Sequence, residues 1–271
     1  MSNNPLLAKV KLPGKVFQLP SKALFYDPGV LAPSAKQGEI QVKPMSALAE
    51  MKLKSADLLI SAKVLEEVCQ ECIPEILKPD DLLSKDVDAI FCFLMSSTYG
   101  DVKTVAAKHN CANAKEHTYN VSLAQMISNM RTELLDKRDL LFTCPLENGQ
   151  IVTLRPVKFS ETIAQINFRQ DILKIEMRGE IVPRQMLEKM VLNDLLTVIA
   201  AVEDDGQRVT ESGFIYEWLA ALQKTSIDMI VKRANEASDW GIDFKQKLTC
   251  KDCNAIFDYD LDLNPINFFS G

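Results

Sequence analysis

LTCKDCNAIFDYDLDL, residues Leu248–Leu263, is the stretch with the strongest structural pattern in the chain. Cys250 and Cys253 are separated by two residues, a spacing that places two thiolates on one tight turn, where both can bind one metal ion. The residues that follow alternate between apolar and acidic, which predicts a half-buried strand. The stretch therefore predicts a zinc-ribbon-like β-ribbon that carries half of a metal site.

A second segment offers the missing ligands. His109 and Cys111 precede a short alternating strand at Tyr119–Leu123, and His117 lies just before that strand. We expect these residues to complete a tetrahedral Cys₃His set made of Cys250, Cys253, Cys111 and either His109 or His117. The upstream segment lacks a second Cys-x-x-Cys. Two outcomes therefore stay open, namely one structural zinc or metal-free thiols in a retained ribbon.

The composition excludes several classes of protein. At 47% hydrophobic and 25% charged residues, the chain has the profile of a packed soluble protein. No apolar run reaches the roughly 18 residues that span a bilayer, and the N-terminus lacks the features of a signal peptide. Seven scattered Cys favour a reducing compartment over a disulfide framework. A net charge of −6 without basic runs predicts that nucleic acid is not a partner.

Hydrophobic periodicity predicts an α+β fold. We expect a mainly helical body with short N-terminal strands and zinc-ribbon-like β-ribbons at 100–123 and 248–264. Four consecutive segments follow from this pattern. They are an extended arm with strands (1–45), a helical segment plus the first ribbon (46–125), a strand-plus-helical body (126–240), and the Cys-x-x-Cys ribbon with an aromatic tail (241–271).

Within these segments the apolar spacing predicts individual helices. Residues 63–77 have their apolar side chains on one stripe, and residues 87–99 are strongly apolar throughout. Residues 186–202 are apolar on most faces, which predicts a buried core helix. Residues 214–237 keep a near-helical spacing and predict one long helix.

Catalytic motifs are absent from the sequence. There is no nucleophile elbow, dinucleotide-binding glycine turn or P-loop. An enzyme would have to use Cys111 with His109 or His117 as a nucleophilic pair. Cys69 and Cys72 repeat the Cys-x-x-Cys spacing, but they lie in a predicted helix, which favours buried helix residues over metal or redox chemistry. We therefore expect no catalytic residues.

Several short motifs along the chain occur together in one protein family. They are Leu19–Tyr26 (LPSKALFY), Ile40–Ser46 (IQVKPMS), Asp81–Leu83 (DLL), Ser96–Gly100 (SSTYG), and the closing Cys-x-x-Cys strand with its tail Asn264–Phe269 (NPINFF). Together they resemble the T-even-type bacteriophage baseplate hub assembly proteins. The resemblance covers the first 120 residues and the last 25. Ala23 departs from it, because the family usually has a glycine there.

The resemblance implies a non-enzymatic tail protein, either a baseplate hub component or a baseplate assembly factor. Its implied partners are other phage baseplate or tail proteins, and a homo-oligomer is also compatible with this role. Its implied location is the host cytoplasm during assembly and the tail baseplate of the virion. A zinc-ribbon interaction module and a Cys/His enzyme remain alternatives.

Aromatic residues at the two ends of the chain suit protein contacts. Phe25 and Tyr26 in the arm, and Phe268 and Phe269 in the tail, are candidates for partner binding. We expect the tail pair to pack on its own chain or, as the alternative, on a partner, since large apolar side chains are costly to leave in water.

Overall fold

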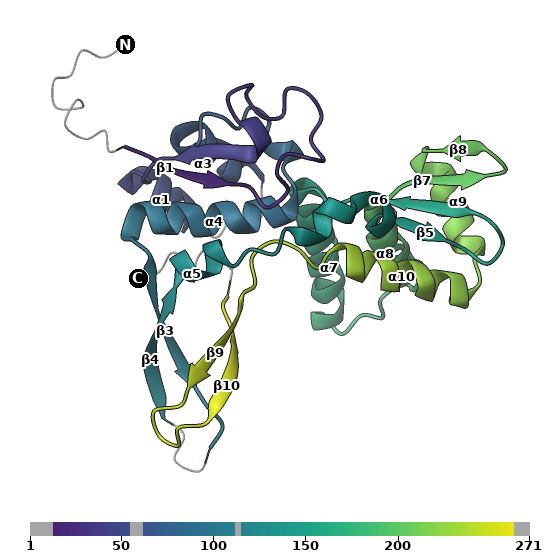
Figure 1. Cartoon of the computed structure of the whole chain (residues 1–271). Coiled ribbons are helices and arrows are strands. Elements are labelled where there is room, and N and C mark those ends of the chain that lie inside the picture. The colour runs from purple at the N-terminus through teal and green to yellow at the C-terminus, as the bar shows by residue number, and fades with distance from the viewer. Residues whose placement is uncertain (1–12, 55–61, 112–114, 263–271) are drawn as a thin grey trace. The chain divides into compact units, whose positions relative to one another are not determined.

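The computed structural model describes residues 13–54, 62–111 and 115–262. The chain divides into two compact units, of which unit 1 comprises Met1–Pro79, Lys85–Arg131 and Gly241–Gly271. Unit 2 comprises Asp80–Ser84 and Thr132–Trp240. Helices combined with small sheets confirm the predicted α+β class (Figure 1). The predicted segments 1–45 and 241–271 and most of 46–125 fall in unit 1, and 126–240 supplies most of unit 2.

Unit 1 combines three β-hairpins or ribbons with helices. Its elements are β1 (Lys15–Gln18), β2 (Glu39–Val42), α1 (Ala47–Leu53), α3 (Ala62–Cys72), α4 (Ser84–Tyr99), β3 (Val102–Lys108), β4 (Glu116–Ser122), α5 (Leu123–Ser128), β9 (Lys245–Thr249) and β10 (Ile256–Asp260). The antiparallel pairs are β1–β2, β3–β4 and β9–β10. The last two pairs are the ribbons that the sequence predicts.

Helix α4 is the core of unit 1. Side chains from Val87 to Ser96 are buried over most of its circumference, as is typical of a helix that is apolar all round. The ring of Phe93 stacks on Phe17 of β1, with centroids 4.5 Å apart and planes 7° from parallel. The N-terminal hairpin is thereby fixed to the central helix.

The loop after β1 is attached to α4 through one buried carboxylate. Asp86 is fully buried, and it accepts hydrogen bonds from the Ser21 backbone N–H (3.0 Å), the Ser21 hydroxyl (2.6 Å) and the Tyr26 hydroxyl (2.6 Å). Lys22 and Ala23 between them have φ of 51° and 61°, in the left-handed region. The LPSKALFY motif therefore forms a turn that the buried Asp86 carboxylate fixes to α4.

Replacing Ala23 with glycine is expected to stabilise the protein by about 0.5–1 kcal/mol. The left-handed conformation costs an L-residue roughly 1–2 kcal/mol, and the greater chain entropy of glycine offsets about half of this gain. Urea unfolding measures the change. The matched control is Ala164→Gly in an exposed helical position, where a loss of about 1 kcal/mol is expected. Equal losses at both positions would contradict the assignment of strain to Ala23.

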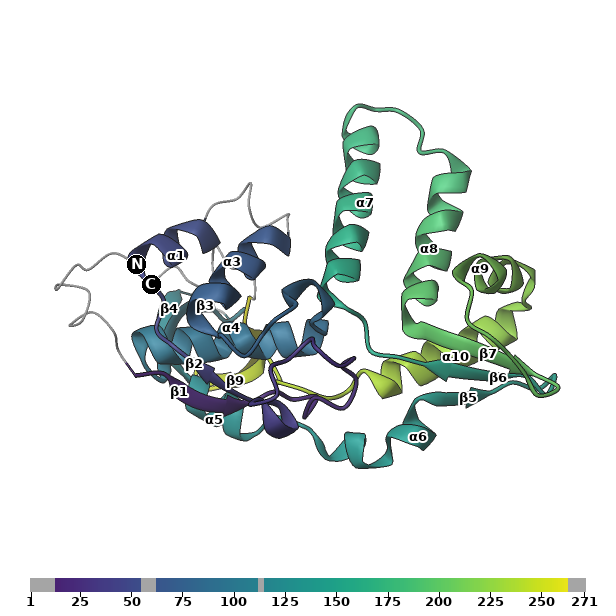
Figure 2. The same ribbon diagram turned by 90° about the horizontal axis from the view of Figure 1, so that it is seen from above.

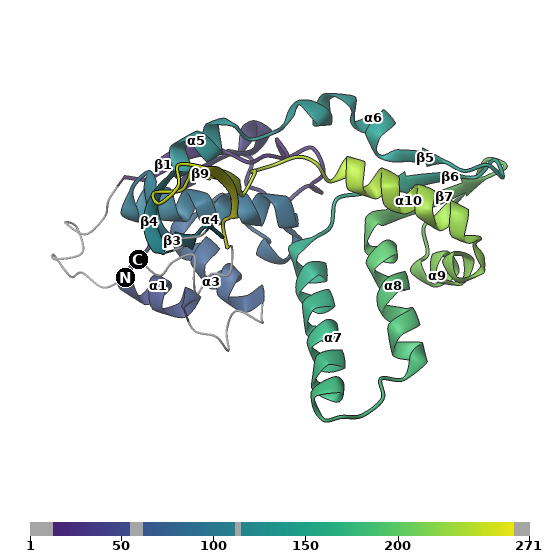
Figure 3. The ribbon, with the colours of Figure 1, turned by 90° about the horizontal axis from the view of Figure 1, so that it is seen from below.

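Unit 2 is built on a four-stranded antiparallel sheet of order β5-β6-β7-β8. Its elements are α6 (Arg138–Leu141), β5 (Thr143–Pro145), β6 (Ile151–Leu154), α7 (Phe159–Met177), α8 (Arg184–Val198), β7 (Ile199–Asp204), β8 (Gln207–Val209), α9 (Ser212–Ala221) and α10 (Lys224–Ala237). Helix α10 lies along the strands β5 and β6 (Figure 3). Helices α7 and α8 run antiparallel as a hairpin (Figure 2).

Three predicted helices have different bounds in the structure. The helix predicted at 63–77 ends at Cys72, since Pro74 disfavours helical backbone at the residue before it. The helix predicted at 186–202 ends at Val198, and the chain continues as β7. That helix is also not a core helix, because Leu195 is its single buried residue. The helix predicted at 214–237 is two helices, separated where Leu222 and Gln223 are extended.

The β7–β8 hairpin was missed, although the sequence contains its signal. Asp204 pairs with Gln207, so Asp205-Gly206 is a two-residue loop. Both loop residues have positive φ, 47° and 81°, as a type I′ turn requires. The Asp-Gly pair therefore joins two strands of one hairpin.

The chain leaves unit 1 and returns to it at neighbouring residues. Arg131 and Gly241 form an isolated antiparallel bridge. The Arg131 N–H donates to the Gly241 carbonyl (2.9 Å), and the Gly241 N–H donates to the Arg131 carbonyl (2.8 Å). Residues 132–240 therefore form an insertion between two parts of unit 1.

Candidate metal centre

The candidate site lies in unit 1, where the β3–β4 and β9–β10 ribbons run side by side (Figure 1). The β3–β4 pairing extends from Val102↔Ser122 to Lys108↔Glu116, and His109 and Cys111 follow directly after β3. Cys250 and Cys253 lie in the turn that joins β9 to β10. Each ribbon thus presents two ligand-type side chains at its end.

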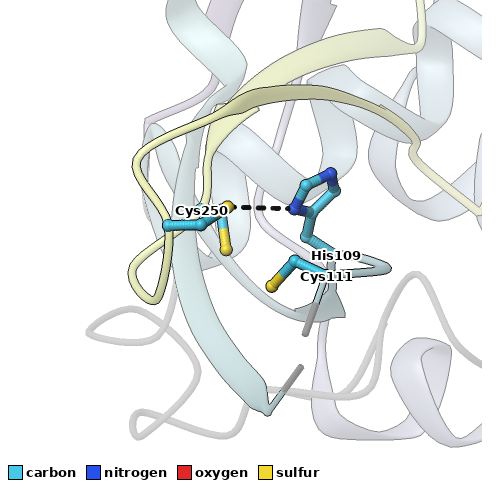
Figure 4. A group of neighbouring side chains, drawn as sticks. His109, Cys111 and Cys250 are labelled. Atoms are coloured by element: carbon cyan, nitrogen blue, oxygen red, sulfur yellow. Dashed lines mark hydrogen bonds between the residues drawn. The ribbon is translucent and has the colours of Figure 1, made fainter. Parts of the chain in front are cut away.

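The four side chains converge on one point. The nearest ligand atoms of His109, Cys111, Cys250 and Cys253 all lie within 4.8 Å of one another. The Sγ atom of Cys253 is 3.4 Å from Nδ1 of His109. A tetrahedral zinc with bonds of about 2.3 Å holds thiolates about 3.8 Å apart, so the four ligand atoms lie within about 1 Å of the spacing that this ion requires. Figure 4 shows His109, Cys111 and Cys250 pointing toward the same spot.

The turn around Cys250 is shaped to present a thiolate. The Asn254 N–H donates to the Cys250 carbonyl (2.9 Å), and Asn254 has a left-handed φ of 58°. Burial raises the pKa of Cys250. The backbone N–H groups of Asp252 and Cys253, together with the side chains of Cys253 and His109, outweigh that effect and lower this pKa to about 6. Because the thiolate is the form that binds metal, the turn favours the ligating state.

Aromatic contacts fix the His109 ring. It stacks on Phe257 of β10, with centroids 5.0 Å apart and planes 24° from parallel. The rings of Tyr119 of β4 and Phe257 meet at a near-right angle, with centroids 5.9 Å apart. Phe257 therefore packs against a candidate ligand in addition to packing the ribbons together.

His117, the other candidate histidine, has a different partner. Its Nε2 atom lies 2.9 Å from a carboxylate oxygen of Asp252. His117 does not belong to the metal-type group that the described residues form. The structure therefore brings together four of the five candidate ligands, and His117 is the one left out.

Asp252 and Phe257 are site residues that the sequence analysis missed. Asp252 lies between the two cysteines of the turn, and the only available signal was its position inside the Cys-x-x-Cys motif. Phe257 is one of the apolar residues in the alternating stretch, and its contact with His109 has no sequence signature.

The second Cys-x-x-Cys has no metal-type geometry in the described part of the chain. Cys69 and Cys72 are both fully buried in α3. Burial raises the pKa of the Cys69 thiol and raises that of Cys72 to about 12, so both remain neutral thiols. They act as small core residues, in line with the prediction of plain helix residues.

The structure describes two of the four aromatic residues that are candidates for partner binding. Tyr26 donates its hydroxyl to Asp86 within the chain, and Phe25 is half-buried. Phe268 and Phe269 lie outside the described residues. Partner binding by all four residues stays a prediction.

Within the described ranges, no helix combines the length and apolar character that a bilayer crossing requires. Comparison with protein families gives a match over residues 31–269 to the family described as T4 bacteriophage base plate protein. No curated protein and no solved structure matches the chain significantly. The match covers most of the chain, including both ribbons, and it confirms the resemblance seen in the short motifs. The protein therefore belongs to the T4 bacteriophage base plate protein family.

Proposed function

We propose that the protein is a non-enzymatic component or assembly factor of the baseplate hub, which acts through contacts with other baseplate or tail proteins. The observation that carries this proposal is the family match over residues 31–269. The test is a phage with a stop codon early in this gene. We expect incomplete baseplates without a normal hub and no plaques, and normal baseplates would contradict the proposal.

We further propose that His109, Cys111, Cys250 and Cys253 hold one structural zinc. Their convergence within 4.8 Å supports this assignment. Four protein ligands saturate a tetrahedral zinc and leave no position for substrate, so the ion would support the fold and would not catalyse a reaction. Metal analysis of protein purified without chelator is expected to give one zinc per chain. Protein that contains no zinc and does not take it up would contradict the assignment.

The enzyme alternative draws on the same residues. Cys111 and His109 are neighbours in the group, as a nucleophilic pair needs to be. A bound zinc would occupy both side chains, which favours the non-enzymatic proposal. Iodoacetamide labelling separates the two functions, because a zinc-bound Cys111 should react slowly until a chelator is added. Fast labelling of Cys111 in metal-loaded protein would favour the enzyme.

We place one partner-binding surface on the α7–α8 hairpin of unit 2. In its two helices only Ile172 and Leu195 are buried. Met177 at the end of α7 is 87% exposed, and Ile181 in the connection is 94% exposed. Large apolar side chains clustered at the end of a projecting hairpin are typical of protein contacts. A second baseplate protein is the expected occupant, because the chain belongs to a baseplate family.

Ile181→Glu is expected to weaken capture of baseplate proteins by at least about 10-fold, because it places a charge in the proposed apolar contact. The measurement is a pull-down from infected cells, with captured proteins identified by mass spectrometry. Since Ile181 is almost fully exposed, the stability of the free protein should not change. Gln185→Glu adds the same charge to an exposed position of α8 and serves as the control. Undiminished capture by Ile181→Glu would remove this surface from the proposal.

The proposed role also specifies where the protein is found. We expect it in the host cytoplasm during assembly and, if it is a hub component, in the baseplate of purified virions. The net charge of −6 supports proteins, and not nucleic acid, as partners. Mass spectrometry of purified virions distinguishes a hub component from an assembly factor, and sedimentation of the purified chain reports any homo-oligomer.

A further inference from the structure

The two histidines of the first ribbon have different environments. His109 directs Nδ1 toward Cys253 Sγ at 3.4 Å, inside the cysteine cluster. Nε2 of His117 lies 2.9 Å from a carboxylate oxygen of Asp252, and the His117 ring meets the Tyr119 ring edge-on with centroids 6.5 Å apart. The His117 and Asp252 side chains are 25% and 16% exposed, so this contact is largely shielded from water. One histidine therefore faces the site, and the other faces the turn that carries half of it.

Asp252 joins the turn of the second ribbon to the first ribbon. It lies between Cys250 and Cys253, and its carboxylate accepts the backbone N–H of Lys115 (3.2 Å) in addition to the contact with His117. Its own backbone N–H is directed toward the Cys250 sulfur. The same residue thus contacts a ligand through its backbone and the opposite ribbon through its side chain.

The neighbouring residue strengthens this connection. Lys251 donates its ammonium group to the Thr118 carbonyl of β4 at 2.8 Å. The same ammonium lies 5.3 Å from the centre of the Tyr119 ring, within the range of a cation–π contact. Two consecutive turn residues therefore bind β4, and they fix the position of the cysteines relative to the first ribbon.

We infer that His109, through Nδ1, is the imidazole ligand and that His117 with Asp252 is a positioning pair, which holds the Cys250–Cys253 turn against the first ribbon before the metal binds. This inference rests on the proposed zinc site. Mutation of residues that orient metal ligands typically weakens metal affinity 10- to 100-fold. Such residues hold the ligands in place in advance, so that less conformational freedom is lost when the metal binds.

Cobalt substitution identifies the ligand histidine. Co²⁺ replaces zinc in tetrahedral thiolate sites, and its visible spectrum reports the ligand set. We expect His109→Gln to change the spectrum of the full chain, and His117→Gln to leave it as in the wild type. The opposite result, a changed spectrum in His117→Gln alone, would make His117 the ligand and overturn the inference.

Metal affinity tests the positioning role. By competition with a chromogenic chelator, Asp252→Asn and His117→Gln are each expected to weaken zinc binding about 10- to 100-fold, with an unchanged cobalt spectrum. The double variant should lose little more than either single variant, because the two residues act as one pair. Asp258→Asn, an exposed acid of β10, is the matched control and should bind as the wild type does.

Two results would contradict the inference in distinguishable ways. If the wild type binds neither Co²⁺ nor Zn²⁺, the zinc site itself is wrong. If the wild type binds zinc and Asp252→Asn matches Asp258→Asn, only the positioning role is wrong. Circular dichroism of the metal-free variants shows whether each chain is folded. Should His117→Gln not fold, Asp252→Asn gives the same comparison, because asparagine keeps the size and one acceptor oxygen.

Discussion

Cys250→Ser is expected to abolish stoichiometric zinc binding and to make the joined ends of the two ribbons of unit 1 less stable. Structural zinc contributes roughly 10–16 kcal/mol in small zinc domains. Divided equally among four ligands, this contribution is about 3 kcal/mol per ligand, which corresponds to a more than 100-fold change in zinc affinity. The effect should be large at Cys250 because this thiol is buried within the turn, at 1% exposure. Zinc content after dialysis against a weak chelator measures the loss.

Limited proteolysis gives a second readout for this variant. Without the metal, the turn that carries Cys250 and Cys253 keeps the contacts of Lys251 and Asp252 with the first ribbon but loses its metal bonds, so cleavage near residues 250–255 is expected to accelerate. The matched control is Cys69→Ala, which removes a cysteine from the other Cys-x-x-Cys. That variant should lose some stability through a cavity but retain one zinc per chain. Full zinc retention by Cys250→Ser would contradict the assigned ligand set.

Asp86→Leu is expected to lower the free energy of unfolding by about 3–5 kcal/mol. The substitution leaves the Ser21 N–H, the Ser21 hydroxyl and the Tyr26 hydroxyl without their acceptor in a buried setting. Each unsatisfied buried group costs about 1–3 kcal/mol. Urea unfolding measures the loss. Asp86→Asn, which keeps an acceptor oxygen, is the control and should lose much less, whereas equal losses would contradict this explanation.

The same carboxyl group should make stability depend on pH. Burial raises the pKa of Asp86 from 3.8 to about 6, against the lowering effect of the hydrogen bonds from Ser21 and Tyr26. The folded chain therefore holds this proton more tightly than the unfolded chain. Its favourable contribution is present below pH 4 and is lost as the pH rises through 6, by up to about 3 kcal/mol. Half-buried Asp88, whose pKa burial also raises to about 6, acts in the same direction.

Unfolding of the wild type and Asp86→Asn between pH 4 and 7 isolates this contribution. Other carboxyl groups, such as Asp101 with its lowered pKa, change stability in the opposite direction in both proteins. The difference between the two proteins removes their effect. We expect the advantage of the wild type over Asp86→Asn to shrink as the pH rises from 4 to 6. A constant difference would show that Asp86 does not titrate in this range.

Local patterns were sufficient to predict the two ribbons and most of the metal group. The Cys-x-x-Cys spacing and the alternation after it are short-range signals, and they gave Cys250, Cys253 and the strand β10. Which of His109 and His117 joins the cysteines is not determined by neighbouring residues in the sequence. It depends on the β3–β4 register, in which His117 pairs with Ala107 while His109 lies beyond the paired residues.

The role of Asp86 had no local signal at all. Its partner Ser21 is 65 residues away in the sequence, and acids at the start of an apolar helix usually face water. The end of α8 was missed for a related reason. Ile199 and the residues after it continue the apolar pattern of the helix, and only their pairing with β6 makes them a strand.

The paired backbones of Arg131 and Gly241 have a consequence for the evolution of the chain. Because the ends of residues 132–240 are adjacent, a recombination event that exchanges this segment for another folded one would not stretch or shift the rest of unit 1. The substitute would need to cover Leu82 and Leu83, which are buried in unit 2. The junction therefore permits exchange of residues 132–240 while the ribbons keep their structure.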